Sequence, residues 1–420
     1  MTNNNGSVAR PFHGWKIVGL AMLAEFISVG FTSYLIGLYI EPLSKAFNAT
    51  PGQLGWASSL FMLIVTLMGP LTGYWVDRDK VRVVLMAGAL ALSSGMMLLS
   101  QATTLIYATL TWVFLISPGA AMLSIVTIGA LVVQWFERRR GLVMGMVTAG
   151  MSLGGFAMPP ITAWLFSAFG WRLGTFSLGL FVAVVLVPTV WLIAVSKPAD
   201  LGQHPDGEAP ASTTVPSARE PSPKGFRQFV SRRDFWFICA AVGTTTFTSI
   251  MIITYLVPYA RAAGLDMRLS ALLLSVYAGA AFFGKFIAGW LSDRFEPRRI
   301  LSGITLCMAL GFLPMVLFKE VVVCIPISIA LVGLAVGGMM PVWISIIARN
   351  FGPQAYGRVQ GAMGVMLVTV TVIPGPLGGY IFDTSGSYAP AFTLLIGVLL
   401  AGFVFTLLIP QQAERIGVDH

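Results

Sequence analysis

The chain is dominated by apolar runs that are each long enough to cross a lipid bilayer, and no other feature constrains its fold as strongly. The runs lie at 15–40, 54–76, 83–101, 105–135, 141–168, 173–196, 235–260, 270–292, 300–318, 321–348, 359–382 and 390–410. A membrane helix needs about 20 apolar residues, and backbone groups inside a bilayer must bond within a helix or a closed barrel. Barrel strands would alternate in polarity over about 10 residues, and the chain has no such segments. The sequence therefore predicts an all-α protein with twelve transmembrane helices.

The distribution of basic residues predicts how these helices are oriented. Charged residues make up 10% of the chain, with 26 Lys and Arg against 17 Asp and Glu. With the N-terminus in the cytoplasm, 20 basic residues fall on the cytoplasmic side, five on the outer side, and Lys285 inside a span. Such a bias is typical of cytoplasmic loops, so we expect a multi-pass protein of an inner or plasma membrane with both termini cytoplasmic. The basic surplus then reflects topology and contact with membrane lipid, and we expect no nucleic-acid partner.

One long break divides the chain into two halves. Residues 197–234 are rich in Pro, Ala and Ser and end in a basic stretch. We expect an N-terminal six-helix bundle at 1–196, a cytoplasmic linker at 197–234 and a C-terminal six-helix bundle at 235–420. The basic stretch is expected to follow the topology and contact lipid headgroups, and a regulatory partner site is the alternative.

The two halves repeat one another at an offset of 216 residues. The matching pairs are Tyr39 and Tyr255, Pro42 and Pro258, Lys45 and Arg261, Gly73 and Gly289, Asp77 and Asp293, Arg78 and Arg294, Gly141 and Gly357, Gly145 and Gly361, and Gly170 and Gly386. Nine matches at one offset indicate a duplicated six-helix unit. Parallel repeats of this size are typical of secondary transporters whose binding site lies between two pseudo-symmetric halves that rock against each other.

A short motif recurs at the repeat distance. It reads Gly73-Tyr-Trp-Val-Asp77-Arg78 after the second span and Gly289-Trp-Leu-Ser-Asp293-Arg294 after the eighth. The motif resembles the signature loop of the major facilitator superfamily. The resemblance implies that the glycines allow close helix approach and that the acids pair with basic residues to latch the cytoplasmic side. A loop that only sets topology is the alternative.

Three further segments resemble particular branches of that superfamily. Gly375 to Phe392, His13-Gly14-Trp15 and Phe169-Gly170-Trp171-Arg172 are similar to the monocarboxylate transporter and oxalate:formate antiporter branches. The fifth span also carries Gly141, Gly150 and Gly154, spaced like a motif of drug:proton antiporters. It departs from that motif at Gly155 and at Met158-Pro159, which lowers the expectation of drug efflux. Tight helix packing and kinking explain the same glycines and prolines structurally.

Two ionisable residues, Glu25 and Lys285, lie deep inside spans. A charge at the bilayer centre costs at least ~2.5–3.5 kcal/mol, so such residues usually face a cavity, pair with each other or do chemistry. Glu25 lies roughly 15 Å along its helix from Trp15, and Lys285 roughly 12 Å from Asp293, so the two could lie at similar depth.

Glu25 is the expected proton site. Ser28 and Thr32 share its helical face, which indicates that this face meets water, substrate or another helix. Burial favours the protonated carboxyl group, so Glu25 could bind and release a proton as a cavity opens and closes. A neutral Glu25 bonded between helices is the alternative. Thr245, in a polar run of the seventh span, is a further candidate to line the cavity, although its hydroxyl could bond its own helix.

Lys285 is the expected anion site. It stands where the resembling carriers place an arginine that holds the substrate carboxylate, and a lysine offers a point charge in place of a two-pronged donor. Ala281 and Gly37 stand where proton-coupled monocarboxylate carriers have an aspartate and a lysine, so Glu25 would have to supply the proton site. A lysine neutralised by Glu25, or reaching toward the interface, is the alternative.

Lys45 and Arg261 end the first and seventh spans on the expected outer side. Two cations there could draw anions to the mouth of the protein, although cations also suit helix C-termini.

Taken together, the residues predict a secondary transporter and not an enzyme. The chain has no phosphate-binding Gly-Lys-Ser/Thr loop and no clustered metal ligands, and its three cysteines lie apart in apolar runs, so we expect no cofactor, metal or ATP use. We expect a monomer that moves a small organic anion, a monocarboxylate first of all, together with a proton by alternating access. Proton-driven efflux of apolar compounds is the alternative among transporters, and a membrane sensor that binds a solute without moving it is the alternative from another class.

Overall fold

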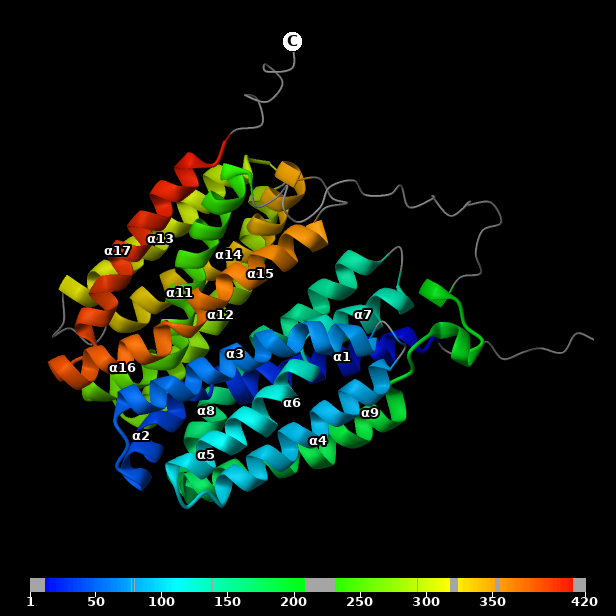
Figure 1. Ribbon diagram of the computed structural model, residues 1–420, viewed down its shortest axis with the longest axis horizontal. Coiled ribbons are helices and arrows are strands. Elements are labelled where there is room, and N and C mark those ends of the chain that lie inside the picture. Colours follow the sequence, from blue (N-terminus) through cyan, green and yellow to red (C-terminus); the bar gives the residue numbers. More distant parts are fainter. Residues whose placement is uncertain are drawn as a thin grey trace, which may run out of the picture.

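The computed structural model describes residues 12–76, 78, 80–136, 139–207, 231–292, 294–317, 324–351 and 356–410. Over these residues the protein is built from helices joined by short connections (Figure 1). The all-α prediction is confirmed.

The first half of the chain forms six membrane-spanning segments, several of them built from consecutive helical pieces. These are α1 (Gly14–Ser28), η1 (Val29–Ser33) and α2 (Ile36–Phe47); α3 (Pro51–Val76); α4 (Val81–Ser100); α5 (Leu105–Thr111), η2 (Trp112–Ile116), α6 (Ser117–Met122) and α7 (Ile125–Trp135); and α8 (Arg140–Phe181), η3 (Val182–Leu186) and α9 (Val187–Ile193), which together hold the fifth and sixth segments. Two short 3-10 turns, η4 (Pro198–Leu201) and η5 (Pro205–Gly207), follow. The pieces η1, η2 and η3 are single π-helical turns, which locally widen a helix.

The second half forms six more segments. They are α11 (Arg233–Ala262), α12 (Met267–Ser292), α13 (Pro297–Leu317), α14 (Cys324–Phe351), α15 (Tyr356–Val372) with α16 (Pro374–Ser385), and α17 (Ala389–Leu408). The last break falls at Pro374, which cannot donate a backbone hydrogen bond.

Eleven helices in the described part of the chain are long and apolar enough to cross a membrane. One of them, Leu142–Ile193, is 52 residues long and covers nearly all of two predicted spans, 141–168 and 173–196. It is interrupted at Gly170, where φ is 77° and ψ is 161°. The chain turns there, so the twelve predicted spans are confirmed.

The duplication is visible in the backbone. Gly170 ends the fifth segment with φ 77°, and its repeat partner Gly386 ends α16, in the eleventh segment, with φ 68°. Positive φ is accessible to glycine at little cost and strains residues with a Cβ, so the same turn residue is used at the same place in both halves. The ψ angles differ, at 161° for Gly170 and 7° for Gly386, so the repeat keeps the glycine and its positive φ but not an identical turn.

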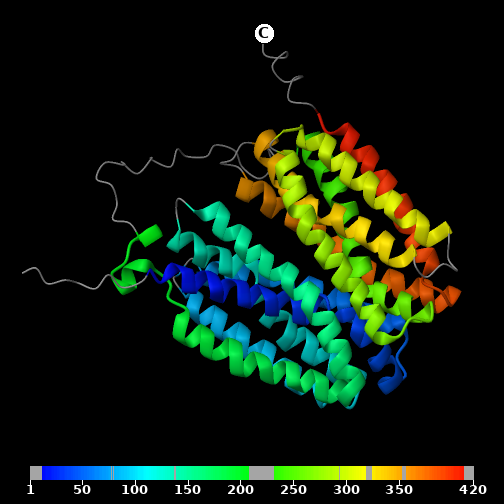
Figure 2. The same ribbon diagram turned by 180° about the vertical axis from the view of Figure 1, so that it is seen from behind.

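The two bundles touch at one end and diverge at the other. In Figures 1 and 2 the N half (α1–α9) and the C half (α11–α17) meet near α2 and α16 and lie apart where the helices approach residues 197–207. We call the end that holds Glu41, Arg261 and Asp383 the closed end, and the end that holds Arg78, Arg294 and residues 197–207 the linker end. The predicted domain boundaries stay predictions, and residues 208–230 of the expected linker lie outside the described part.

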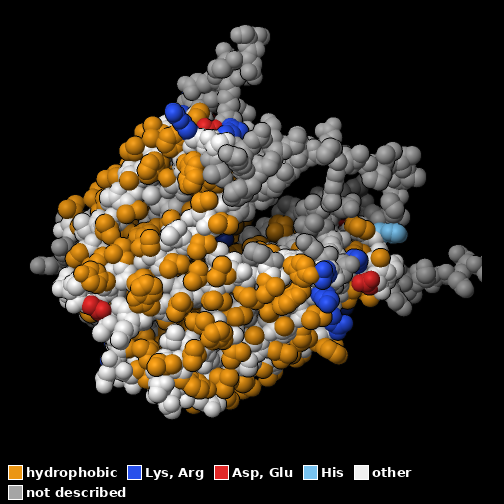
Figure 3. Space-filling view, viewed as in Figure 1, with side chains coloured by type: hydrophobic (Ala, Val, Ile, Leu, Met, Phe, Trp, Pro, Cys, Tyr) orange, Lys and Arg blue, Asp and Glu red, His pale blue; other side chains and the backbone are white. Residues whose placement is uncertain are grey.

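The surface fits a protein immersed in lipid. Apolar side chains cover most of the visible face in Figure 3, and Lys and Arg gather toward the edges where the helices reach the linker end. Trp191, Phe114 and Ile106 are among the large apolar side chains that are mostly exposed, at 64%, 68% and 72%. In water such exposure would be unfavourable, whereas against lipid tails it is not.

Candidate functional site

Lys285 lies at the boundary between the two halves. It belongs to α12 of the C half, yet its ammonium group donates to Ser152 Oγ of α8 at 2.7 Å and approaches the Thr148 carbonyl oxygen at 3.4 Å. Among the described residues, no carboxylate lies within ion-pair distance of the Lys285 Nζ. In the described part of the chain, this partly buried cation therefore has only neutral acceptors, and the opposite half supplies them.

Lys285 is the innermost of three polar contacts along the α8–α12 interface. Arg268 Nη2 donates to Ser167 Oγ at 3.4 Å near the closed end, and Ser275 Oγ donates to the Phe156 carbonyl oxygen at 2.6 Å farther in. Beyond Lys285, toward the linker end, we find no further hydrogen bond between the described parts of α8 and α12. Lys285 thus sits where the joined part of this interface ends.

Glu25 is buried on α1 of the N half. The residue is 1% exposed, and its Oε1 atom has no hydrogen-bond partner among the described residues. Glu25 and Lys285 interact electrostatically without a direct ion pair between these two described residues. A buried carboxyl oxygen without a partner is unusual in a folded protein, because leaving it unsatisfied costs about 1–3 kcal/mol. An unsatisfied buried carboxyl oxygen of this kind makes Glu25 a candidate for a functional group.

The close packing of α1 on α8 brings the helix that carries Glu25 against the helix that carries Ser152. A Cβ on Gly150 or Gly154 would collide with the carbonyl oxygens of Met22 or Phe26 on α1. These glycines therefore allow the two backbones to approach closely, as expected from the structural interpretation of the fifth span. Ser152, two residues from each glycine, lies on the other side of α8, toward α12.

The other predicted cavity residues donate to backbone carbonyls. Ser28 Oγ donates to the Ala120 carbonyl at 3.1 Å, Thr32 Oγ1 to the Ser28 carbonyl, and Thr245 Oγ1 to the Val242 carbonyl at 2.9 Å. All three residues are buried, at 4%, 1% and 0% exposed. Their proposed contact with substrate stays a prediction.

The closed end is fastened by an ion pair that the sequence analysis did not identify. Arg261 of α11 donates to both carboxylate oxygens of Glu41 on α2, at 2.7 and 3.0 Å, and Lys45 donates to the same carboxylate at 2.7 Å. The two predicted mouth cations therefore share one anion. Glu41 precedes Lys45 by four residues, a spacing that favours an ion pair on one helix, but nothing in the sequence indicated that Arg261 would reach across from the other half.

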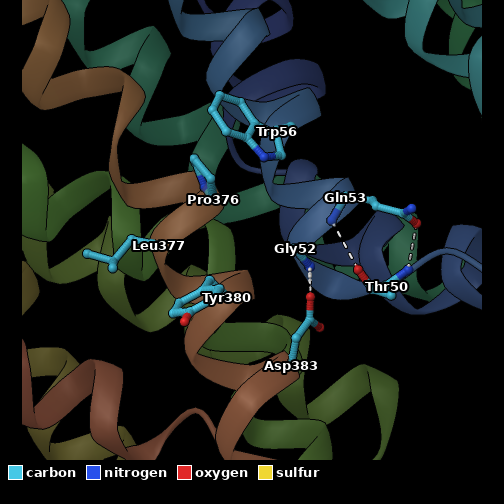
Figure 4. Close-up of a pocket in the computed structure, with 8 residues that line it drawn as sticks. All are labelled: Thr50, Gly52, Gln53, Trp56, Pro376, Leu377, Tyr380 and Asp383. Atoms are coloured by element: carbon cyan, nitrogen blue, oxygen red, sulfur yellow. Dashed lines mark hydrogen bonds between the residues drawn. The ribbon is translucent and has the colours of Figure 1, made fainter.

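Helices α3 and α16 meet near the closed end almost backbone to backbone. A Cβ on Gly55 would collide with the Gly375 carbonyl oxygen, and one on Gly52 would collide with Asp383. The Gly52 amide donates to Asp383 Oδ2 at 3.2 Å, and Thr50 and Gln53 cap the start of α3 reciprocally (Figure 4). A cavity of about 460 Å³ opens beside this contact. Figure 4 shows its lining: Thr50, Gly52, Gln53, Trp56, Pro376, Leu377, Tyr380 and Asp383.

The two signature loops lie at the linker end. Arg78 stacks over the Tyr74 ring and Arg294 over the Trp290 ring, each with its Cζ 4.0 Å from the ring centre. Among the described residues, a Cβ added to Gly73 or Gly289 would have no neighbour within 4 Å. In this conformation the described helices therefore do not make the close approach implied for these glycines. Asp77 and Asp293 lie outside the described residues.

Comparison with known proteins gives a family for this fold. The model of the Major Facilitator Superfamily matches residues 21–366 and 264–418. The chain is 25% identical to monocarboxylate transporter 13 of Bos taurus over 407 residues, covering 95% of this chain and 89% of that protein. It is also 25% identical to the MFS transporter asaE of Aspergillus flavus over 421 residues, covering 97% and 89%.

A solved structure shares the fold. A bacterial homologue of the human lysosomal transporter Spinster superimposes with a TM-score of 0.69 over 95% of this chain and 96% of that chain, at 16% identity. At this identity the similarity concerns the fold alone.

Proposed function

The chain belongs to the major facilitator superfamily, and on that premise we propose that it moves a small organic anion, a monocarboxylate first of all, together with a proton by alternating access. The observation that carries the proposal is the Lys285 ammonium group, partly buried between the halves and held by neutral acceptors alone among the described residues. A carboxylate would give this cation the charged acceptor that it lacks, and such charge-assisted bonds are roughly twice as strong as neutral ones. The relatives named as monocarboxylate transporters support the same class of substrate.

Glu25 supplies the proton site in this proposal. It is buried, one of its oxygens has no partner, and it is electrostatically coupled to Lys285. An anion at Lys285 removes the positive charge that favours ionised Glu25, so anion binding promotes proton uptake by Glu25. The two charges then cross together as a neutral load, which a low-dielectric pathway tolerates better than a bare anion.

The proposal also assigns the two ends. The closed end is the outer side, and the linker end faces the cytoplasm, in keeping with the bias of Lys and Arg toward the linker end. On this assignment, an anion would approach Lys285 from the cytoplasm. Rocking of the two bundles would part Glu41 from Arg261 and bring the signature loops together.

Uptake of labelled lactate into liposomes that contain the purified protein tests this function. We expect an inward proton gradient to drive accumulation above the external concentration, at an initial rate well above that of protein-free liposomes under the same gradient, where only the protonated acid diffuses through the lipid. Absence of gradient-stimulated uptake above the protein-free rate for lactate, pyruvate and acetate would overturn the proposal. Gradient-driven movement of an apolar dye in place of the acids would favour the efflux alternative.

A further inference from the structure

The hydrogen bond between Lys285 and Ser152 joins the two halves at the innermost point of their α8–α12 interface. Ser152 belongs to the N half and is 6% exposed, and Lys285 belongs to the C half. The Thr148 carbonyl, one helical turn from Ser152, is the second acceptor. In this conformation the ammonium group is therefore held by atoms of the opposite half.

A carboxylate and Ser152 are competing acceptors for this ammonium group. An ionised oxygen is a better acceptor than a hydroxyl, so a bound carboxylate would draw Lys285 away from α8. Breaking the contact without a replacement is unfavourable, because a charge in an apolar surrounding must keep its partners. Separating the Lys285 ammonium group from Ser152 therefore has a small free-energy cost when an anion is bound and a large one when no anion is bound.

We propose that the Lys285–Ser152 hydrogen bond is a tether between the two halves that a carboxylate releases by taking over the ammonium group. This inference rests on the proposed function for the identity of the releasing ligand. In the empty protein the tether holds the closed end shut, and in the loaded protein the halves are free to rock. The loaded form then reorients faster than the empty form, so the protein exchanges anions across the membrane faster than it moves them in one direction.

Transport measurements test the release. We compare Ser152→Ala, which removes the acceptor, with Ser152→Thr, which keeps a hydroxyl, and with Ser177→Ala, a control on α8 whose hydroxyl donates to the Leu173 carbonyl of its own helix. In proteoliposomes loaded with labelled lactate, we expect Ser152→Ala to raise net efflux relative to lactate exchange roughly tenfold, the ratio that about 1.4 kcal/mol produces. The KM for lactate should fall, because binding no longer has to break the tether. Ser152→Thr and Ser177→Ala should behave as the parent protein.

An unchanged ratio of efflux to exchange in Ser152→Ala would overturn the inference. A higher KM would also overturn it, because Ser152 would then help the ammonium group to hold the anion. If Ser152 were needed only for folding, Ser152→Ala would not raise the ratio of efflux to exchange while it lowers the KM for lactate.

A second measurement needs no substrate and separates failure of the inference from failure of the proposed function. Spin labels at Ala46→Cys on α2 and Ala263→Cys beyond α11, in protein whose native cysteines are replaced, report the distance between the halves at the closed end. In detergent without any anion, Ser152→Ala should increase the population with separated labels, and Ser177→Ala should not. If this shift occurs while no carboxylate is transported, the tether stands and the proposed substrate falls. If the labels do not move, the tether falls whatever is transported.

Discussion

At the scale of single residues, the position of charges within apolar runs was enough to identify Glu25 and Lys285. In a chain with 10% charged residues, a charge in the middle of an apolar run is conspicuous. Their surroundings could not be predicted in the same way. That Lys285 bonds Ser152 depends on how two helices far apart in the sequence pack, and Ser152 is an ordinary small polar residue in its own span. The ion pair of Glu41 could not be predicted for the same reason, since its partner Arg261 lies 220 residues away.

The charge on Lys285 is expected to matter more than its shape. Lys285→Ala should abolish saturable lactate transport, whereas Lys285→Arg should retain it with a changed KM, because guanidinium keeps the charge but binds carboxylate in a fixed two-pronged geometry. Initial rates of lactate uptake over a range of concentrations check this. Wild-type kinetics in Lys285→Ala would remove Lys285 from the anion site.

Glu25 is expected to couple transport to the proton gradient. In Glu25→Gln the group is permanently neutral, so lactate exchange should continue while accumulation driven by a proton gradient is lost. The exchange rate of this variant should also vary less with pH than that of the parent protein. A Glu25→Gln protein that still concentrates lactate would exclude this role.

At the scale of elements, apolar run length predicted the membrane helices well and their internal breaks poorly. The runs marked the spans to within a few residues, because the bilayer requires length and apolarity of each one. The π-helical turns at η1, η2 and η3 left no comparable signal, since they arise from local hydrogen-bond geometry. The contact between α3 and α16 across the two halves could not be predicted, because the sequence does not show which residues lie next to the glycines that form it.

The ion pair between α2 and α11 is expected to stabilise the closed end. Arg261→Gln removes the two bonds to Glu41 between the halves, and a partly exposed ion pair contributes about 1 kcal/mol at most, so the population with a parted closed end should rise up to about fivefold. The labels at Ala46→Cys and Ala263→Cys measure this population. Lys45→Gln is the matched control, since Lys45 contacts Glu41 on its own helix and its side chain is 74% exposed. Equal effects of both variants would mean that charge at the mouth, and not the contact between halves, sets the equilibrium.

At the scale of the whole molecule, the repeat of 216 residues predicted two similar bundles but not which end joins them. Both conformations of a rocking protein are made from one sequence, so residue patterns mark contacts of either state. Gly73 and Gly289 illustrate this: the family resemblance implies a close contact for them, and here an added Cβ would meet no described residue. The glycines that pack closely across the two halves include Gly52, Gly55 and Gly375 of the closed end.

Glycine substitutions at opposite ends are therefore expected to bias the molecule in opposite directions. Gly73→Leu should fit the present conformation and hinder closure of the linker end, slowing transport while the closed end stays shut. Gly55→Leu should collide with Gly375 and hold the closed end apart. The label distance between Ala46→Cys and Ala263→Cys, together with transport rates, checks this pair. Gly303→Leu on α13, where an added Cβ meets no described residue, is the control and should leave this distance unchanged. A similar shift in Gly303→Leu would mean that the larger side chain disturbs the helix and not the interface.

The meeting of α3 with α16 has a consequence for how the closed end responds to its surroundings. Part of this seam is formed by uncharged main-chain atoms of Gly52, Gly55 and Gly375, whereas the Glu41–Arg261 pair is charged and partly exposed. Dissolved ions screen the second kind of contact and leave the first almost untouched, with a screening length of about 8 Å at physiological ionic strength. Concentrated salt should therefore loosen the closed end no more than loss of the Glu41–Arg261 pair does, because the main-chain part of the seam stays in place.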